Sequence, residues 1–124
     1  MSIKRAEYDI SVYRGDTPTY RFQVIDVDDD TSEETIVDIT EHVITGQVRY
    51  SPDSDVWFNL PITKTEPSNG VFEIPFTKAL SDSILPVGSI EPDTALYDIQ
   101  MSHSDKVFTF LYGKFRISRD ITRA

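Results

Sequence analysis

Apolar and polar residues alternate along much of this chain, which is the pattern of strands that place one face on a core. The alternation is clearest over residues 44–50 and 97–102, where every second residue is apolar or glycine. Segments rich in Gly, Pro, Asp, Asn and Ser separate the apolar runs and have the composition of turns. The pattern predicts strands within residues 8–13, 20–24, 35–39, 44–50, 56–60, 72–76, 97–102 and 107–118.

One short segment has helical spacing. Thr77 is a candidate N-cap, and Leu80 with Ile84 forms an i, i+4 apolar pair. Pro86 and Gly88 end this helix. The chain is therefore expected to form a single domain over residues 1–124, an all-β, immunoglobulin-like antiparallel β-sandwich of about 7–8 strands with one short helix near 77–85. The cysteine pair of true immunoglobulin domains is absent.

The last predicted strand, residues 107–118, leaves two interpretations open. If its odd positions face the core throughout, then Phe108, Phe110 and Tyr112 point outward as an interaction patch. If instead a β-bulge lies at Gly113, the three aromatics face inward and Phe115 follows them into the core. The bulge is slightly favoured because it exposes less apolar area. Where both faces are covered, a neighbouring subunit is the expected cover.

Composition excludes several classes of protein. The formal net charge of −9 and the pI near 4.5 argue against nucleic-acid binding and against adsorption to anionic membranes. The chain has no cysteine, so neither a disulfide nor a thiolate site is available. Neither a signal peptide nor a run of the ~20 apolar residues that a membrane helix needs is evident. We therefore expect a soluble protein that is made inside a cell.

The acidic segment 26–34 is a calcium candidate through Asp26, Asp28 and Asp30. Its register differs from that of an EF-hand, because Thr31 stands where glycine is needed and Val37 where the bidentate glutamate belongs. The favoured interpretation is a solvated hairpin loop whose charges discourage edge pairing.

The remaining polar residues do not form a recognisable catalytic pattern. His42 and His103 lie in separate predicted turns, and a metal site would require the fold to bring them together with a carboxylate. No serine has the glycine pattern of a nucleophile elbow around it. We expect no catalytic site, no metal and no cofactor.

The candidates for protein contact are aromatic or basic. Trp57 is either a sugar-stacking platform or part of a core or interface, and the interface interpretation is preferred. Arg119 and Arg123 give the C-terminal end positive charge and could form a docking tail, whereas a frayed terminus is the default. The tripeptide Arg14-Gly15-Asp16 spells a cell-adhesion motif, but its physical content is a turn.

Several short motifs occur in order along nearly the whole chain. They include a turn at 14–17 followed by the strand 20–22, a corner at 38–40, the strands 46–50 and 97–100, the strand 108–117 with its Gly-Lys-Phe, and the end 120–123. In this order they resemble the amino-terminal immunoglobulin-like domain of the phage baseplate upper protein family, which consists of tailed-phage virion proteins. Unlike the longer members of that family, this chain is expected to have no coiled coil or receptor-binding domain after Ala124.

The resemblance implies a non-enzymatic structural or adaptor protein of a tailed-phage virion. It would dock other tail or baseplate proteins through strand edges and an aromatic patch, in multiple copies within a symmetric assembly. Its location would be the virion, after synthesis in the bacterial host cytoplasm. The contact candidates are Trp57, Phe108, Phe110, Tyr112, Arg119 and Arg123. Two alternatives stay open, a capsid decoration protein and a carbohydrate- or receptor-binding module.

Overall fold

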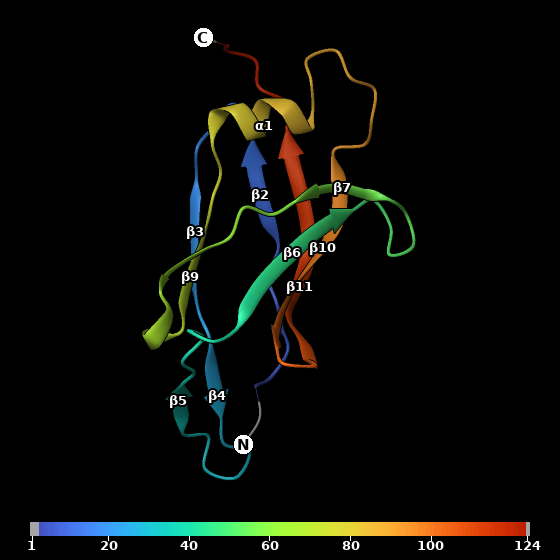
Figure 1. The fold of residues 1–124 in the computed structure, drawn as a ribbon. Coiled ribbons are helices and arrows are strands. Elements are labelled where there is room, and N and C mark those ends of the chain that lie inside the picture. The colour runs from blue at the N-terminus through green and yellow to red at the C-terminus, as the bar shows by residue number, and fades with distance from the viewer. Residues whose placement is uncertain (1–2, 124) are drawn as a thin grey trace.

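Two sheets packed face to face form the protein, with a short helix across one end (Figure 1). This is a computed structural model, and it describes residues 3–123. The larger sheet has six strands, in the order β1-β11-β10-β6-β7, with β2 also paired to β11. Its strands are β1 (Ala6–Glu7), β2 (Ile10–Tyr13), β6 (Val43–Arg49), β7 (Val56–Asn59), β10 (Thr94–His103) and β11 (Lys106–Ser118).

The second layer is a smaller sheet of β3 (Thr19–Gln23), β9 (Val71–Pro75) and β8 (Thr63–Glu66). A separate hairpin of β4 (Ile25–Val27) and β5 (Glu34–Ile36) extends from the end opposite the helix (Figure 1). The helical elements are η1 (Pro67–Asn69) and α1 (Lys78–Ile84). The all-β sandwich with one short α-helix is thus confirmed.

The structure differs from the prediction in the number and direction of its strands. Eleven strands lie within residues 3–123, three more than the eight predicted ranges. The strand β1 precedes the run 8–13 across a break, β4 (Ile25–Val27) pairs with β5, and Thr63–Glu66 pairs with β9. Because every residue of Thr63–Glu66 is polar, the sequence has no apolar alternation there that would predict a strand. Both β1 and β2 run parallel to β11, so the larger sheet is mixed rather than purely antiparallel.

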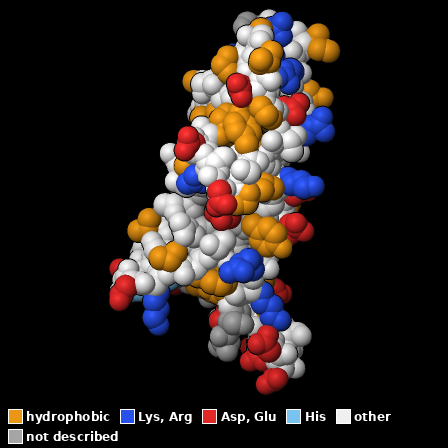
Figure 2. All heavy atoms as spheres, turned by 90° about the vertical axis from the view of Figure 1, so that its right-hand side faces the viewer, with side chains coloured by type: hydrophobic (Ala, Val, Ile, Leu, Met, Phe, Trp, Pro, Cys, Tyr) orange, Lys and Arg blue, Asp and Glu red, His pale blue; other side chains and the backbone are white. Residues whose placement is uncertain are grey.

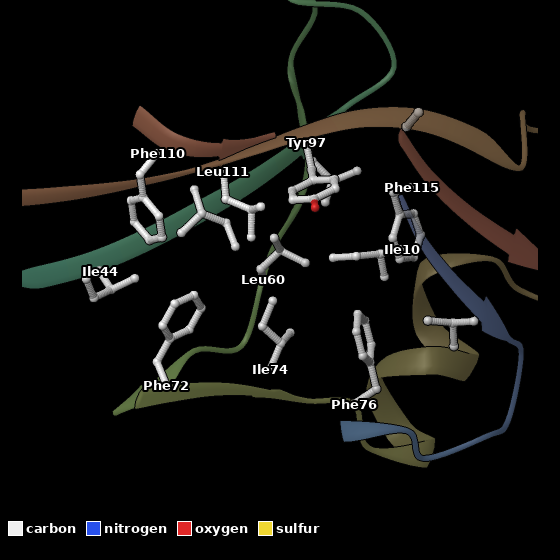
Figure 3. Close-up of a cluster of buried hydrophobic side chains, with 14 of the residues drawn as sticks. Ile10, Ile44, Leu60, Phe72, Ile74, Phe76, Tyr97, Phe110, Leu111 and Phe115 are labelled. Atoms are coloured by element: carbon white, nitrogen blue, oxygen red, sulfur yellow. The ribbon is translucent and has the colours of Figure 1, made fainter. Parts of the chain in front are cut away.

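The core fills the space between the two sheets (Figure 3). The larger sheet contributes the buried side chains of Ile10, Ile99 and Phe115, and the smaller sheet those of Phe72 and Ile74. Each of these residues lies on the inward face of its strand, as the alternation predicts. Each Å² of apolar surface removed from water contributes about 25 cal/mol, so the burial of these side chains is the main source of stability.

The helix α1 closes one end of the sandwich. The Thr77 hydroxyl accepts a hydrogen bond from the amide of Leu80 at 3.1 Å, which confirms the predicted N-cap. Ile84 and Leu85 bury their side chains in the core, so the helix is held by packing as well as by its cap. No helix within the described part of the chain is long and apolar enough to cross a membrane.

Candidate docking surface

The register of the last hairpin decides where the predicted aromatic patch lies. Ile99 pairs with Leu111, but the next residue of β10, Gln100, pairs with Thr109. Phe110 is therefore the extra residue of a β-bulge, and both Phe110 and Leu111 face the core. Phe110 is only 7% exposed and packs edge-to-face on Phe72, with ring centroids 5.8 Å apart. It is not available as a contact residue.

The predicted bulge at Gly113 is thus wrong in its position. Gly113 has a different role, because the segment between β1 and β2 crosses directly over it. A Cβ atom on Gly113 would lie 2.2 Å from the carbonyl oxygen of Tyr8. The amide of Tyr8 donates to the carbonyl of Tyr112 at 2.9 Å, and the amide of Lys114 donates to Asp9 Oδ1 at 3.0 Å. These contacts hold the break between β1 and β2 against β11.

The other two aromatics of the patch lie on opposite sides of the sheet. Phe108 is partly buried and packs against the core, with the Arg5 guanidinium 5.6 Å from its ring centroid. Tyr112 is 40% exposed on the outer face, as is Leu96 on the neighbouring strand. The side of the molecule in Figure 2 carries its hydrophobic side chains in small groups between charged ones. A continuous aromatic patch is therefore not formed by these three residues.

Trp57 links β7 to the end of α1. Its indole Nε1 donates to the carbonyl of Ile84 at 2.9 Å. Its ring stacks on Tyr50 at 4.6 Å and meets the edge of the Phe115 ring at 5.8 Å. The side chain is half-buried among these partners, which is the environment of a packing residue rather than of a free stacking platform.

The acidic segment folds into a self-capped hairpin loop. Asp28 Oδ1 accepts hydrogen bonds from the amides of Thr31 and Asp30 at 3.0 and 2.9 Å. Those bonds, the one from Thr31 most of all, lower the pKa of Asp28. Asp29 pairs with Lys4 at 3.0 Å. Within residues 3–123 no three ligating side chains are placed to hold a metal ion, so the calcium candidate Asp26, Asp28 and Asp30 is not assembled.

The turn at Arg14 is part of the end of the sandwich that α1 closes. Arg14 is only 4% exposed, its Nε donates to Asp120 Oδ1 at 2.6 Å, and its Nη1 donates to the carbonyl of Leu85 at 3.0 Å. The amide of Gly15, at φ +92°, donates to the buried hydroxyl of Ser81. Because the arginine is enclosed, the tripeptide is a structural turn and does not present an adhesion motif.

Arg119 and Arg123 also donate hydrogen bonds to backbone carbonyls of their own chain. Arg119 Nη2 donates to the carbonyls of Ser89 and Glu91 at 3.0 and 3.1 Å. Arg123 Nη1 donates to the carbonyl of Asp120 at 2.8 Å. The Arg119 bonds hold the C-terminal segment against the loop between α1 and β10. The Arg14–Asp120 pair joins the same segment to the turn after β2, whereas the Arg123 bond lies within the segment.

The loop between α1 and β10 and the C-terminal segment expose three bulky aliphatic side chains. Ile90 is 96% exposed, Ile121 is 93% exposed and Val87 is 62% exposed. Ile90 and Val87 lie on the loop between α1 and β10, and Ile121 lies on the C-terminal segment that Arg119 joins to this loop. Both segments extend from the same end of the sandwich (Figure 1). We call Val87, Ile90 and Ile121 the apical surface.

Sequence reasoning missed the apical surface because its residues stand in segments without alternation. The signal that was available is the position of bulky aliphatic residues beside turn formers, as in the Gly-Ser-Ile-Glu-Pro segment at 88–92. Isolated exposed apolar residues are common on protein surfaces. Three on two segments that are hydrogen-bonded to each other form a more specific feature.

No protein-family model matches the sequence, and no curated protein is similar to it at a significant level.

Proposed function

We propose that this chain is a non-enzymatic structural protein of a tailed-phage virion that docks other tail or baseplate proteins through its apical surface. The observation that carries the proposal is the near-complete exposure of Ile90 and Ile121 on segments that Arg119 holds in place. Apolar side chains on a preformed surface bind a partner without a large cost of ordering.

The resemblance to the baseplate upper protein family also supports docking through this end of the molecule. The motifs at 14–17 and 120–123 are far apart in the sequence, yet Arg14 and Asp120 form an ion pair beside the apical surface. In this proposal, two of the motifs that carry the resemblance have a shared task, which is to hold the docking end in one conformation.

Charge favours a partner other than a second copy of this chain. Each copy has a formal net charge of −9, so two copies repel one another at long range. A virion protein with a neutral or basic surface fits better, and several copies of this chain would be arranged around it by the symmetry of that partner. An interface of standard size buries about 800 Å² on each side, more than three side chains supply. The free edge of β7 (Val56–Asn59) offers further contact.

The first test is the location of the protein on the particle. Immunogold electron microscopy of phage particles from the source culture, with an antibody against this chain, should label the tail end. Labelling over the head would replace the proposal by capsid decoration. Absence of labelling, with the protein free in the lysate, would refute a virion role and favour the binding-module alternative.

The second test is a matched pair of substitutions. The double variant Ile90→Asp/Ile121→Asp should be incorporated into purified particles at least about tenfold less than wild type, because each charge would have to be buried on docking. Val107→Asp is the control, since Val107 is also 62% exposed but lies at the start of β11. Immunoblots of particles from host cells that express each tagged variant during infection provide the measurement. Equal incorporation of the two variants would contradict docking by the apical surface.

A further inference from the structure

The fold brings the two histidines together. His42 lies in the turn before β6, and His103 is the last residue of β10. Their ring centroids are 5.3 Å apart and the ring planes are inclined by 41°. Both rings line an open hollow of about 560 Å³, which is also lined by Met101, Asp105, Lys106, Val107 and Phe108.

The hydrogen bond of His103 determines which of its nitrogens is free. His103 Nδ1 lies 3.0 Å from the carbonyl oxygen of Glu41. A carbonyl oxygen can only accept, so Nδ1 carries the proton and donates it. The lone pair of the neutral ring is then on Nε2. A histidine that donates one ring N–H to a backbone carbonyl and keeps the other nitrogen unprotonated has the arrangement found in metal-ligating histidines.

The ring of His42 has an unused nitrogen in a rigid turn. His42 Nδ1 is buried, and no hydrogen-bond partner for it exists within residues 3–123. The backbone around the ring is held, because Lys64 Nζ donates to the carbonyls of His42, Thr40 and Ile39 at 2.7, 3.1 and 3.2 Å. A buried polar atom without a partner costs free energy, so a ligand that bonds to this nitrogen removes that cost.

The spacing of the rings agrees with a shared metal ion. Two imidazoles on one tetrahedral Zn²⁺ have Zn–N lengths of about 2.0–2.1 Å, and with each centroid about 1.1 Å behind its nitrogen the centroids lie about 5.2 Å apart. The observed centroid separation is 5.3 Å. Imidazole nitrogen prefers Zn²⁺, Ni²⁺ and Cu²⁺ over Ca²⁺ and Mg²⁺.

We propose that His42 and His103 bind one divalent transition-metal ion, with Zn²⁺ as the reference ion. No group of three ligating side chains is formed within residues 3–123, so water would have to fill the remaining positions around the ion. Asp105 and Lys106 both line the hollow and bring opposite charges, which offset each other locally. The overall charge of −9 attracts cations to the whole surface. The metal would join the turn before β6 to the tip of the β10–β11 hairpin, independently of the docking role.

Isothermal titration calorimetry of the chelator-treated full chain with ZnCl₂ tests the proposal. We expect one ion per chain, and an affinity weakened at least about tenfold by His103→Gln, a change at an exposed residue. His42→Asn should have the same effect, with circular dichroism to confirm that it folds. CaCl₂ should give no heat under the same conditions.

The control is Asp28→Asn with Asp30→Asn in the acidic loop, which should leave Zn²⁺ binding unchanged. Failure of the wild-type chain to bind Zn²⁺ at millimolar concentration would refute the proposal. It would be refuted equally by binding that survives both histidine variants or that is lost in the loop variant, since the ion would then be held elsewhere.

Discussion

Replacement of Gly113 by alanine tests a close approach between two segments of this fold. The added Cβ would lie 2.2 Å from the carbonyl oxygen and 2.8 Å from the carbonyl carbon of Tyr8, and 3.1 Å from Asp9 Oδ1. Two of these neighbours are backbone atoms, which cannot rotate away as the end of a side chain can. The segment between β1 and β2 must therefore move off β11 to accommodate a methyl group.

The cost of that movement follows from the contacts that it strains. The hydrogen bonds at risk are Tyr8 N to Tyr112 O, Lys114 N to Asp9 Oδ1, and the Tyr97 hydroxyl to the Tyr8 carbonyl. Each contributes about 1 kcal/mol net, and overpacking of a tight contact adds about 1–3 kcal/mol. With all three bonds lost, we expect Gly113→Ala to lower the free energy of unfolding by about 4–6 kcal/mol, a large part of the 5–15 kcal/mol typical of a domain.

Urea unfolding followed by tryptophan fluorescence measures this loss, because Trp57 is the only tryptophan and packs on Phe115 of β11. Gly88→Ala is the matched control. A Cβ on Gly88 would have no atom within 4 Å, but its φ is +86°. That substitution should cost only the left-handed backbone penalty of about 1–2 kcal/mol. If Gly113→Ala were no more destabilising than Gly88→Ala, the argument from the close approach would be refuted.

Three further outcomes are expected. Phe110→Ala should destabilise the domain by about 3–5 kcal/mol in urea unfolding, because it empties a core position, whereas Tyr112→Ala on the outer face should cost less than about 1 kcal/mol. The hydrogen bond from the Arg14 guanidinium lowers the pKa of Asp120 in the folded state. The ionised carboxylate therefore stabilises the fold at pH values above its pKa in the unfolded chain, and this stabilisation is lost as pH falls through the lower pKa of the folded state. The stability difference between wild type and Asp120→Asn should accordingly shrink as pH falls from about 5 to 2, and a difference constant with pH would contradict the ion pair. Thr77→Ala should cost about 1 kcal/mol through the lost N-cap, and an unchanged unfolding midpoint would show that the cap is dispensable.

The parts of the structure that were predictable depend on neighbours in the sequence. Alternation located β6, β10 and most of β11, because a strand with one buried face needs an apolar residue at every second position. The N-cap at Thr77 and the end of α1 near Leu85 follow from equally local chemistry. The polar strand β8 and the parallel pairing of β1 and β2 carry no such local signal.

The candidate contact residues show where local reasoning ends. In the aromatic run at 108–112 the sequence shows apolar residues on both faces, and one of the two interpretations placed a change of face at Gly113. The face of the sheet on which each aromatic side chain lies depends on the pairing of β11 with β10. There, one extra residue at Phe110 moves every later side chain to the opposite face. Register is a long-range property, so a strand without a bulge, a bulge at Gly113 and the observed bulge at Phe110 are all compatible with the same sequence.

By itself the sequence determined the class of the fold, the short helix α1 with its cap, and the acidic charge that disfavours anionic partners. The tertiary structure alone decided which residues meet. It placed Gly113 under Tyr8, Arg14 beside Asp120 and His42 beside His103, and it brought the segments that carry Ile90 and Ile121 to the same end of the molecule. The physical reason is that strand periods repeat within a few residues, whereas these contacts join segments brought together by sheet pairing, whose register a single bulge can change.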